Sequence, residues 1–332
     1  MSVRARILKG DQGIAEAVAI LRRGEVVGLP TETVYGLAGD AFQPMAAARI
    51  FEAKGRPLTD PLIVHLPEVG WLERVARIDS LEQQIQVQQL AAAFWPGPLT
   101  LTLQKHPDLP DLITAGMESV AVRVTAHPLF QKVLRELGSP LAAPSANRFG
   151  KISPTTAEDV QIELGDVIPA ILDGGACEHG LESTIVAITK EGFEILRPGP
   201  ITKEQLSKYG HVVHPSGIVN TPGSLPGHYA PKTELHILET DIKSFIPPLK
   251  AGLLVLRTPD PEVIERYAAV EVLSPSGDLR EAAANFYGAL RRLDNCKVDI
   301  IFSKSLREEG IGVAVMDRMR RAAYGSVNDL KR

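Results

Sequence analysis

Residues 210–232 interrupt the hydrophobic patterning of the chain and constrain its folding more than any other stretch. They hold four prolines and four glycines and show little periodicity. The chain has 332 residues, which is too long for one typical hydrophobic core. We therefore predict a larger domain at 1–209, a linker at 210–232 and a smaller domain at 233–332. Loops of this length are uncommon unless they are disordered or functional, so the linker is a candidate functional segment.

The first predicted domain alternates short apolar runs with stretches of helical spacing, which is typical of an α/β fold. Helices are predicted at 14–21, 44–53, 80–94 and 127–137, and at a segment capped by Thr155 or Thr156 that ends at 164. Strands are predicted at 26–29, 61–66, 99–103, 119–124, 141–143, 167–172, 183–188 and 193–196. Ligands of open α/β sheets gather at the carboxyl ends of strands, so we searched there for functional residues.

The second predicted domain repeats the alternation on a smaller scale. Strands are predicted at 235–238, 252–256, 270–273 and 298–302, and helices at 261–268, 279–293 and 316–324. This pattern predicts a small parallel, Rossmann-like α/β domain with right-handed crossovers. It contains no glycine-rich phosphate fingerprint, so we predict no nucleotide site within it.

The composition disfavours several classes of protein. Hydrophobic residues make up 44% and charged residues 23%, which is ordinary for a globular protein, and no apolar run approaches the ~18 residues of a membrane span. The N-terminus lacks the apolar region of a signal peptide. Cys177 and Cys296 show no zinc-type spacing and fit a reducing compartment, so we expect a cytoplasmic location. A net charge of −4 argues against a broadly basic, nucleic-acid-binding surface.

Cations near predicted strands are the first candidates for a binding site. Lys54 and Arg56 flank a glycine on a turn before the apolar run 62–64. Arginine holds oxyanions bidentately and lysine holds them as a point charge, although an isolated turn of this kind is more often a solvated loop. Arg123 lies among small apolar residues of a predicted strand, where it needs an anionic partner. A ligand or a structural carboxylate would serve equally well.

Two turns rich in polar side chains follow predicted strands. The stretch 30–37 carries Thr31 and Thr33, which could line a substrate edge or cap a helix. Ser145 and Asn147 are two residues apart on an extended segment and so face the same way. A hydroxyl and an amide facing one way suit nucleotide or phosphate recognition, but they also suit an ordinary turn.

Taken together, these motifs resemble threonylcarbamoyl-AMP synthases of the long, two-domain form, whose first domain is YrdC-like. The resemblance covers essentially the whole chain. It is carried by Pro30–Leu37, Lys54–Pro57, Pro61–His65, Trp95–Thr100, Thr114–Gly116, Val122–Arg123, Ala126–Pro128, Ala143–Asn147, Asp173–Gly175, Glu182–Ile185, Arg197–Pro200, His228–Pro231, Leu293–Asp294 and Gly310–Arg318. It implies a twisted, open, mixed sheet with a concave basic pocket, followed by a smaller parallel Rossmann-like domain.

The resemblance also implies an activity. L-threonine, bicarbonate (or CO2) and ATP become threonylcarbamoyl-AMP and pyrophosphate, and another protein, a tRNA threonylcarbamoyl transferase, uses the product to modify tRNA. Mg2+ is expected with ATP, held largely through phosphate oxygens, and no protein metal ligand stands out. Neither a stable nucleic-acid complex nor membrane association is expected.

Site residues follow from the matched motifs. Lys54 and Arg56 are the predicted catalytic cations, which face the phosphates. The predicted ATP-binding residues are Lys54, Arg56, Thr114, Ser119, Ser145, Asn147, Ser153, Arg197, His228 and Tyr229. The predicted threonine-binding residues are Thr31, Tyr35, His65, Arg123, Ala143 and Ser183. His65 is the best candidate for a general base, with a structural histidine as the alternative; Tyr35 could instead be an ordinary core residue.

Three positions depart from the family pattern. Asp60 stands where the family often has asparagine, so it could repel phosphate or pair with one of the cations. Thr125 replaces a common proline, and we expect no consequence. The stretch 224–227 replaces a segment that is often aromatic and basic, which predicts fewer lid contacts to the nucleotide.

Other functions are compatible with parts of the pattern. A related carbamoyl-adenylate enzyme, as in hydrogenase maturation, would carry extra zinc-finger-like segments, and the scarcity of cysteine argues against it. A non-catalytic RNA-binding module predicts affinity for RNA that falls steeply with salt. The second domain could also be a regulatory or docking module.

Overall fold

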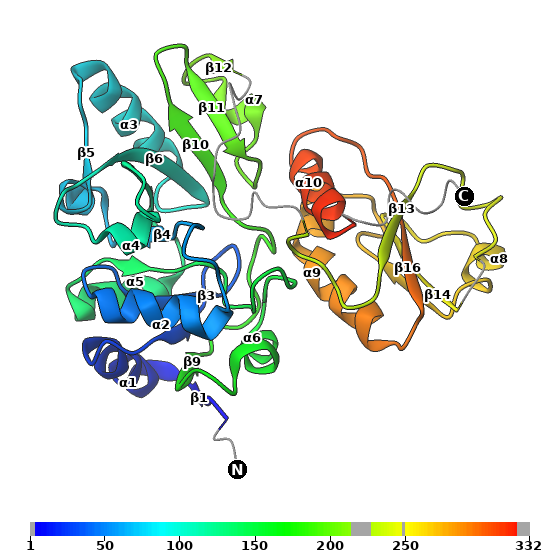
Figure 1. Ribbon diagram of the computed structural model, residues 1–332. Helices are drawn as coiled ribbons and strands as arrows, with labels where there is room; N and C mark the ends of the chain where they lie inside the picture. The colour runs from blue at the N-terminus through cyan, green and yellow to red at the C-terminus, as the bar shows by residue number, and fades with distance from the viewer. Residues whose placement is uncertain (1–3, 214–226, 248–249, 324–332) are drawn as a thin grey trace. The chain divides into compact units, whose positions relative to one another are not determined.

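The computed structural model describes residues 4–213, 227–247 and 250–323, and it divides into two compact units (Figure 1). The first unit comprises residues 1–149, 154–178 and 182–224, and the second comprises 150–153, 179–181 and 225–332. Two short segments from the first part of the sequence therefore belong to the second unit. Most of the predicted linker, including the departure at 224–226, lies outside the described residues.

The first unit is built on a mixed sheet. Its strands are β1 (Arg6–Leu8), β2 (Val27–Leu29), β3 (Gly36–Asp40), β4 (Ile63–His65), β5 (Ala76–Arg77), β6 (Leu99–Lys105), β7 (Ser119–Arg123), β8 (Leu141–Ala142), β9 (Ala170–Leu172), β10 (Thr184–Ile188), β11 (Phe193–Arg197) and β12 (Val212–Val213). They run in the order β1-β9-β2-β3-β8-β4-β7-β6-β10-β11-β12, and β5 pairs with β6. Parallel and antiparallel pairs alternate irregularly, which confirms the predicted mixed sheet.

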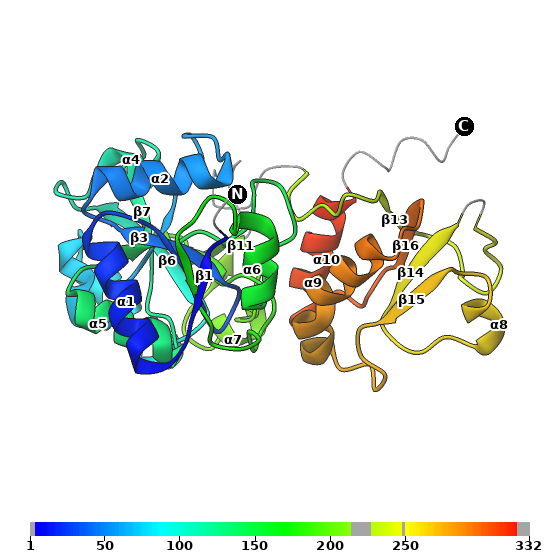
Figure 2. The same ribbon diagram turned by 90° about the horizontal axis from the view of Figure 1, so that it is seen from below.

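Helices cover both faces of this sheet. They are α1 (Gly10–Arg22), α2 (Pro44–Lys54), α3 (Leu81–Phe94), α4 (Asp111–Thr114), α5 (Pro128–Leu137), α6 (Ala157–Leu164) and α7 (Lys203–Leu206), with a 3-10 turn at Val69–Arg74. Alternate residues of β9 join different apolar clusters: Ala170 and Leu172 pack with α1 and α5, whereas Ile171 packs with residues of α2, α3 and α6. Because successive side chains of a strand point to opposite faces, the two clusters lie on opposite faces of the sheet (Figures 1 and 2).

Local sequence signals explain several boundaries. Thr156 caps α6 in a capping box with Asp159, and Ser80 caps α3. The strand β3 was not predicted, and its first two residues lie in the stretch 30–37 that we expected to be a turn. The sequence Gly-Leu-Ala-Gly-Asp has no alternation of apolar and polar residues and little strand propensity. Gly39 allows a close approach of α2, because a Cβ there would lie 3.2 Å from the Cβ of Ala46.

The second unit has a four-stranded sheet in which every pair is parallel, as predicted. Its strands are β13 (Leu235–Leu238), β14 (Ala251–Val255), β15 (Ala269–Val272) and β16 (Ile300–Lys304), in the order β13-β16-β14-β15. Its helices are α8 (Pro261–Ile264), α9 (Leu279–Asn295) and α10 (Gly312–Ala322). In the part of the chain that the structure describes, no helix is long and apolar enough to cross a membrane.

Two helices of the second unit differ from the prediction. The helix α8 is shorter because the chain tightens after it, with the Tyr267 amide bonded to the carbonyl three residues earlier. The helix α10 begins at Gly312, four residues before its predicted start. Glycine is a poor helix former, so the sequence did not predict this first turn of α10. Glycine is required there because a Cβ would lie 2.1 Å from the Arg307 carbonyl oxygen.

Candidate active site

Lys54 is the last residue of α2, and its ammonium is buried against a neighbouring loop. Nζ donates hydrogen bonds to the carbonyl oxygens of Ser145, at 2.6 Å, and Asn147, at 2.5 Å. The Phe149 amide in turn donates to the Lys54 carbonyl oxygen at 2.8 Å. The predicted catalytic lysine and the predicted Ser145–Asn147 segment therefore lie side by side. Gly55 adopts a left-handed conformation that ends the helix and turns the chain towards Arg56.

Arg56 pairs with Asp60, which is one of the two alternatives that the sequence left open for Asp60. Its Nη2 lies 2.9 Å from Asp60 Oδ1 and donates to the Pro61 carbonyl oxygen at 2.7 Å, while Nε donates to the Asp60 carbonyl oxygen at 3.1 Å. Burial raises the pKa of Asp60, although Arg56, Lys54 and Arg197 all act in the opposite direction. One carboxylate thus lies within electrostatic reach of three cations. Burial, and then repulsion from Arg56, holds the pKa of Lys54 well below its ordinary value.

Arg197 ends β11 and is bound to the start of β10. Its Nη2 donates to the carbonyl oxygen of Ser183 at 2.9 Å and to its hydroxyl at 3.1 Å. The Ser183 hydroxyl is also 2.7 Å from the Thr100 hydroxyl on β6. A predicted nucleotide-side cation therefore contacts a predicted threonine-side hydroxyl directly.

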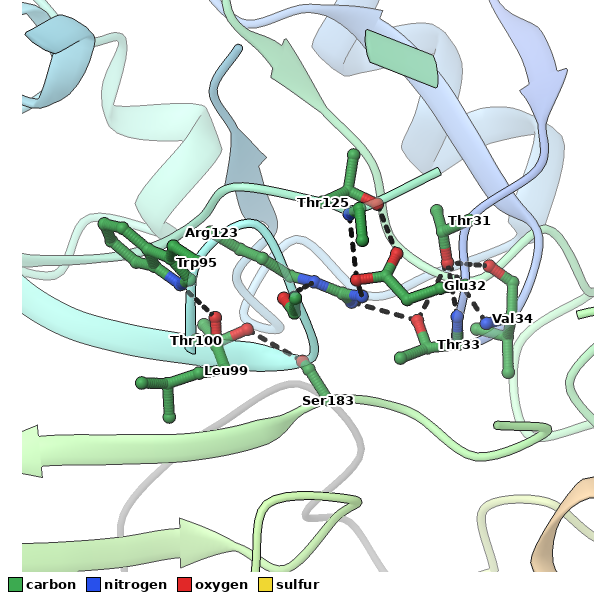
Figure 3. A network of polar contacts seen from close by, with 12 residues as sticks. Thr31, Glu32, Thr33, Val34, Trp95, Leu99, Thr100, Arg123, Thr125 and Ser183 are labelled. Atoms are coloured by element: carbon green, nitrogen blue, oxygen red, sulfur yellow. Dashed lines mark hydrogen bonds and ion pairs between the residues drawn. The ribbon is translucent and has the colours of Figure 1, made fainter. Parts of the chain in front are cut away.

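Arg123, at the end of β7, is paired with a carboxylate that the sequence analysis did not single out (Figure 3). Its Nη2 lies 2.7 Å from Glu32 Oε1, and both side chains are buried. Nη1 donates to the Thr33 hydroxyl at 2.9 Å and Nε donates to the Gly97 carbonyl oxygen at 3.1 Å. The structural carboxylate left open as an alternative partner is therefore present. The two residues are far apart in the sequence, so no spacing signal connects them.

Glu32 is ionised in this setting. Burial alone would raise its pKa, but Arg123, the Thr125 hydroxyl and the Ala126 amide together lower the pKa of Glu32 to about 2. The Thr125 hydroxyl donates to Oε2, and the Ala126 amide donates to Oε1 at 3.1 Å. Thr125, for which we expected no consequence, thus contributes a buried donor that proline would lack.

The Thr31 hydroxyl organises its own turn. It accepts hydrogen bonds from the amides of Thr33, at 3.1 Å, and Val34, at 3.2 Å, and it donates to the Val34 carbonyl oxygen at 2.6 Å. No helix begins at this turn, so the helix-cap alternative was wrong. The Thr33 hydroxyl lies 2.8 Å from that of Thr31 and connects the turn to Arg123. Thr33, which the sequence analysis placed at the substrate edge but not among the threonine-binding residues, is thus a further site candidate.

His65 ends β4 and lies opposite Arg123 in the β4–β7 pair. Its ring packs against Phe130 with centroids 4.9 Å apart. Burial, and then Arg123, lowers the pKa of His65 to about 3, so the imidazole is neutral at pH 7. A pKa this low makes a weak base, which favours the structural alternative over the general base.

Tyr35 and Ala143 occupy structural positions next to the site. The Tyr35 hydroxyl donates to the Gly175 carbonyl oxygen at 2.8 Å and accepts from the Gly174 amide at 3.0 Å. Its side chain is fully buried, which favours the core alternative. The Ala143 amide donates to the Ile63 carbonyl oxygen at 2.9 Å and so continues the sheet beside His65.

The remaining predicted residues are more scattered. Thr114 is buried at the end of α4, and Ser119 is exposed at the start of β7. Ser153, His228 and Tyr229 belong to the second unit. There Tyr229 is left-handed (φ 66°), its ring lies 5.7 Å from that of Tyr287, and the Arg318 guanidinium lies 5.3 Å from its centroid.

Known proteins with similar sequences extend over nearly the whole chain. Residues 19–199 match the Sua5/YciO/YrdC model, described as telomere recombination, and residues 201–324 match the model described as threonylcarbamoyl-AMP synthase, C-terminal domain. The threonylcarbamoyl-AMP synthase of Bacillus subtilis is 39% identical, with 98% of this chain and 97% of that protein covered. The Schizosaccharomyces pombe synthase is 32% identical, with 93% and 88% covered.

A solved structure agrees with these matches. The crystal structure of Pyrococcus abyssi Sua5 complexed with L-threonine has a TM-score of 0.86 and 35% identity, with 96% of this chain and 97% of that chain covered. The fold and the matched models define a two-domain protein with a YrdC-like first domain. The chain belongs to the threonylcarbamoyl-AMP synthase family.

Proposed function

We propose that the chain makes threonylcarbamoyl-AMP from L-threonine, bicarbonate or CO2, and ATP, with release of pyrophosphate. Family membership makes it an enzyme of the nucleotidyltransferase class that acts in tRNA modification. The observation that carries the proposal is the buried cluster of Lys54, Arg56 and Arg197 around Asp60. The near full-length matches to named synthases support this function over an RNA-binding module or another carbamoyl-adenylate enzyme.

The reaction brings several anions together. The threonine amine combines with CO2 to form a carbamate, and a carbamate oxygen then attacks the α-phosphorus of ATP and displaces pyrophosphate. Because two anions approach each other in a buried site, nearby cations must offset their repulsion. Lys54 and Arg56 would do this at the phosphates, and Arg197 would act on the nucleotide side. Ser145 and Asn147 support this assignment because their carbonyl oxygens hold the Lys54 ammonium.

The threonine side of the site would be formed by the turn at 31–34, Arg123 and Ser183. Arg123 supports a role at the substrate carboxylate because its guanidinium is fixed by three contacts. The remaining assignments, including ATP contacts from Thr114, Ser119, Ser153, His228 and Tyr229, stay part of the proposal. His65 is a weak base, which does not support it as the general base for the threonine ammonium.

We further propose Mg2+ as the ion that accompanies ATP. Among residues 4–213, 227–247 and 250–323, no three His, Cys, Asp or Glu side chains gather as a metal site. Phosphate oxygens would therefore supply most of the ligands, as is usual for this ion. The proposal also includes a cytoplasmic location and transfer of the product to a tRNA threonylcarbamoyl transferase, without a stable nucleic-acid complex.

The decisive experiment is pyrophosphate release from ATP with and without L-threonine and bicarbonate. We expect release that requires both co-substrates and yields threonylcarbamoyl-AMP, identified by mass spectrometry. Release that does not depend on threonine would contradict the proposal. Affinity for RNA that falls steeply with salt, without turnover, would favour the binding module instead.

A further inference from the structure

The Arg123 guanidinium is held at each of its three nitrogens by the first unit itself. Nε is bonded to the Gly97 carbonyl oxygen, Nη1 to the Thr33 hydroxyl and Nη2 to Glu32. A guanidinium is planar, so three contacts in different directions fix both its position and its plane. Its side chain is only 3% exposed, which leaves little freedom to reorient.

Glu32 is fixed in turn from the loop that leads into α5. The Thr125 hydroxyl donates to one carboxylate oxygen, and the Ala126 amide donates to the other at 3.1 Å. Thr125 is itself held by Gln131 of α5, whose Nε2 donates to the Thr125 carbonyl oxygen at 2.8 Å. A continuous series of buried polar contacts therefore runs from Gln131 of α5 through Thr125, Glu32 and Arg123 to Thr33; the Glu32–Arg123 contact is an ion pair and the others are hydrogen bonds. Figure 3 shows the part from Thr125 to Thr33.

We propose that Thr125 and Glu32 are positioning residues for substrate recognition, which act through Arg123 and the turn at 31–34. This inference rests on the proposed function, because it assumes that Arg123 and that turn meet the amino-acid substrate. Removing the Thr125 hydroxyl leaves one Glu32 oxygen without its buried donor, and the carboxylate can then rotate away from Arg123. The guanidinium plane is no longer fixed for a bidentate contact with a carboxylate.

Thr125→Val tests the proposal because it replaces only the hydroxyl by a methyl group. We expect the KM for L-threonine to rise about tenfold, as for loss of a hydrogen bond to a charged group. The KM for ATP and kcat should stay within about twofold, because Thr125 touches no predicted ATP-binding residue. Thr125→Ser keeps the hydroxyl and should restore the threonine KM. Thr155→Val is the matched control, since its hydroxyl donates to the Asp159 carboxylate at 3.2 Å in the same unit.

A double-mutant cycle separates positioning from general damage. In a Glu32→Gln background, Thr125→Val should have almost no further effect on the threonine KM, because the group it orients has lost its charge. A full tenfold effect in that background would overturn the proposal, as would equal rises in both KM values. Thr125→Cys, a weaker donor of similar size, serves if the valine variant does not fold. If wild type itself shows no threonine-dependent turnover, the proposed function fails rather than this inference.

Discussion

The first unit contains two clusters of buried charged side chains, and a buried cation is held differently in each. In one cluster, the Lys54 ammonium is bonded to neutral carbonyl oxygens, and the charges of Arg56, Lys54 and Arg197 all act on the Asp60 carboxylate. In the other, Arg123 is paired with an ionised carboxylate and bonded to a hydroxyl and a carbonyl oxygen. The Lys54 nitrogen is thus held by carbonyl oxygens, whereas the Arg123 charge is compensated by that of Glu32.

The pKa shifts of Lys54 and Glu32 also differ in their effect on charge. Lys54 is held away from its charged form by burial, so the folded protein tolerates this ammonium rather than benefiting from it. Glu32 is held in its charged form, so the folded protein gains from the ion pair. A cation held by neutral carbonyl oxygens suits an anionic ligand, and a guanidinium that is already paired with a carboxylate suits the fixing of geometry. The comparison predicts opposite consequences for stability and activity in the two places.

Replacement of Lys54 should have the largest effect on activity. Lys54→Met should lower threonylcarbamoyl-AMP formation about a hundredfold to a thousandfold, as for loss of a group that stabilises transition-state charge. The free energy of unfolding should change little, because losing two hydrogen bonds is offset by removing a buried cation. Product formation and urea unfolding measure the two effects. Lys132→Met on the exposed face of α5 is the control. A large loss of stability with retained activity would show that Lys54 has a structural role and not a catalytic one.

Glu32→Gln should mainly reduce stability. The pKa of Glu32 is about 2 in the folded protein, below the ordinary 4.5, so its stabilisation is present above pH 4.5 and is lost as pH falls through 2. The variant should be less stable by about 3 kcal/mol at pH 7 and by roughly half of that at pH 3. Urea unfolding at both pH values measures this difference. Glu16→Gln, at a more exposed ion pair with Arg6, should lose less than about 1 kcal/mol. A deficit that does not depend on pH would exclude the ion pair as its cause.

Asp60→Asn should have a smaller effect, in the favourable direction. Removing the carboxylate among the three cations increases their attraction for triphosphate, and we expect the Kd for ATP to fall about threefold to tenfold. Calorimetric titration of ATP measures it. The exposed Asp108→Asn should bind ATP as wild type does. Weaker binding in Asp60→Asn would show instead that Asp60 is needed to orient Arg56.

The smallest expected effect concerns His65. Because burial and Arg123 lower its pKa to about 3, the ring should stay neutral between pH 7 and about pH 4.5. Side-chain nitrogen NMR shifts of His65 should therefore be constant over this range. A titration near pH 6.5 would mean that the region around Arg123 is more open than its contacts indicate.

The sequence predicted elements well where periodicity was strong. Strand β13 has the predicted boundaries, and α2, α3 and α6 begin and end within two residues of them. The sequence analysis missed strand β3 and the first turn of α10. Their glycines, Gly36, Gly39 and Gly312, have no side chain that could contribute to a hydrophobic pattern. These positions are fixed by close tertiary contacts of the backbone, such as that of Gly39 with Ala46.

The candidate site was also predicted only in part: motifs identified its cations but not all of the residues that contact them. Motifs brought Lys54, Arg56, Arg123 and Arg197 forward, and a pairing of Asp60 with one of the cations was one of the two possibilities that the sequence offered. The partner of Arg123 could not be found in this way. Glu32 and Thr125 are 93 positions apart, and the pairing of β3 with β8, of β8 with β4 and of β4 with β7 brings their loops together.

The assignment of residues 150–153 and 179–181 to the second unit affects how freely its sequence can be exchanged. The Ala230 amide donates to the Gly150 carbonyl oxygen at 3.0 Å, and Arg291 of α9 donates to the Ile152 carbonyl oxygen. A Cβ at Gly180 would lie 2.5 Å from the Ala284 carbonyl oxygen, so α9 also requires a glycine from outside its own stretch of sequence. The C-terminal domain consequently cannot be exchanged as one continuous stretch of sequence. A chimera between relatives that changes sequence at the linker should keep its fold only if these two short segments are exchanged with it.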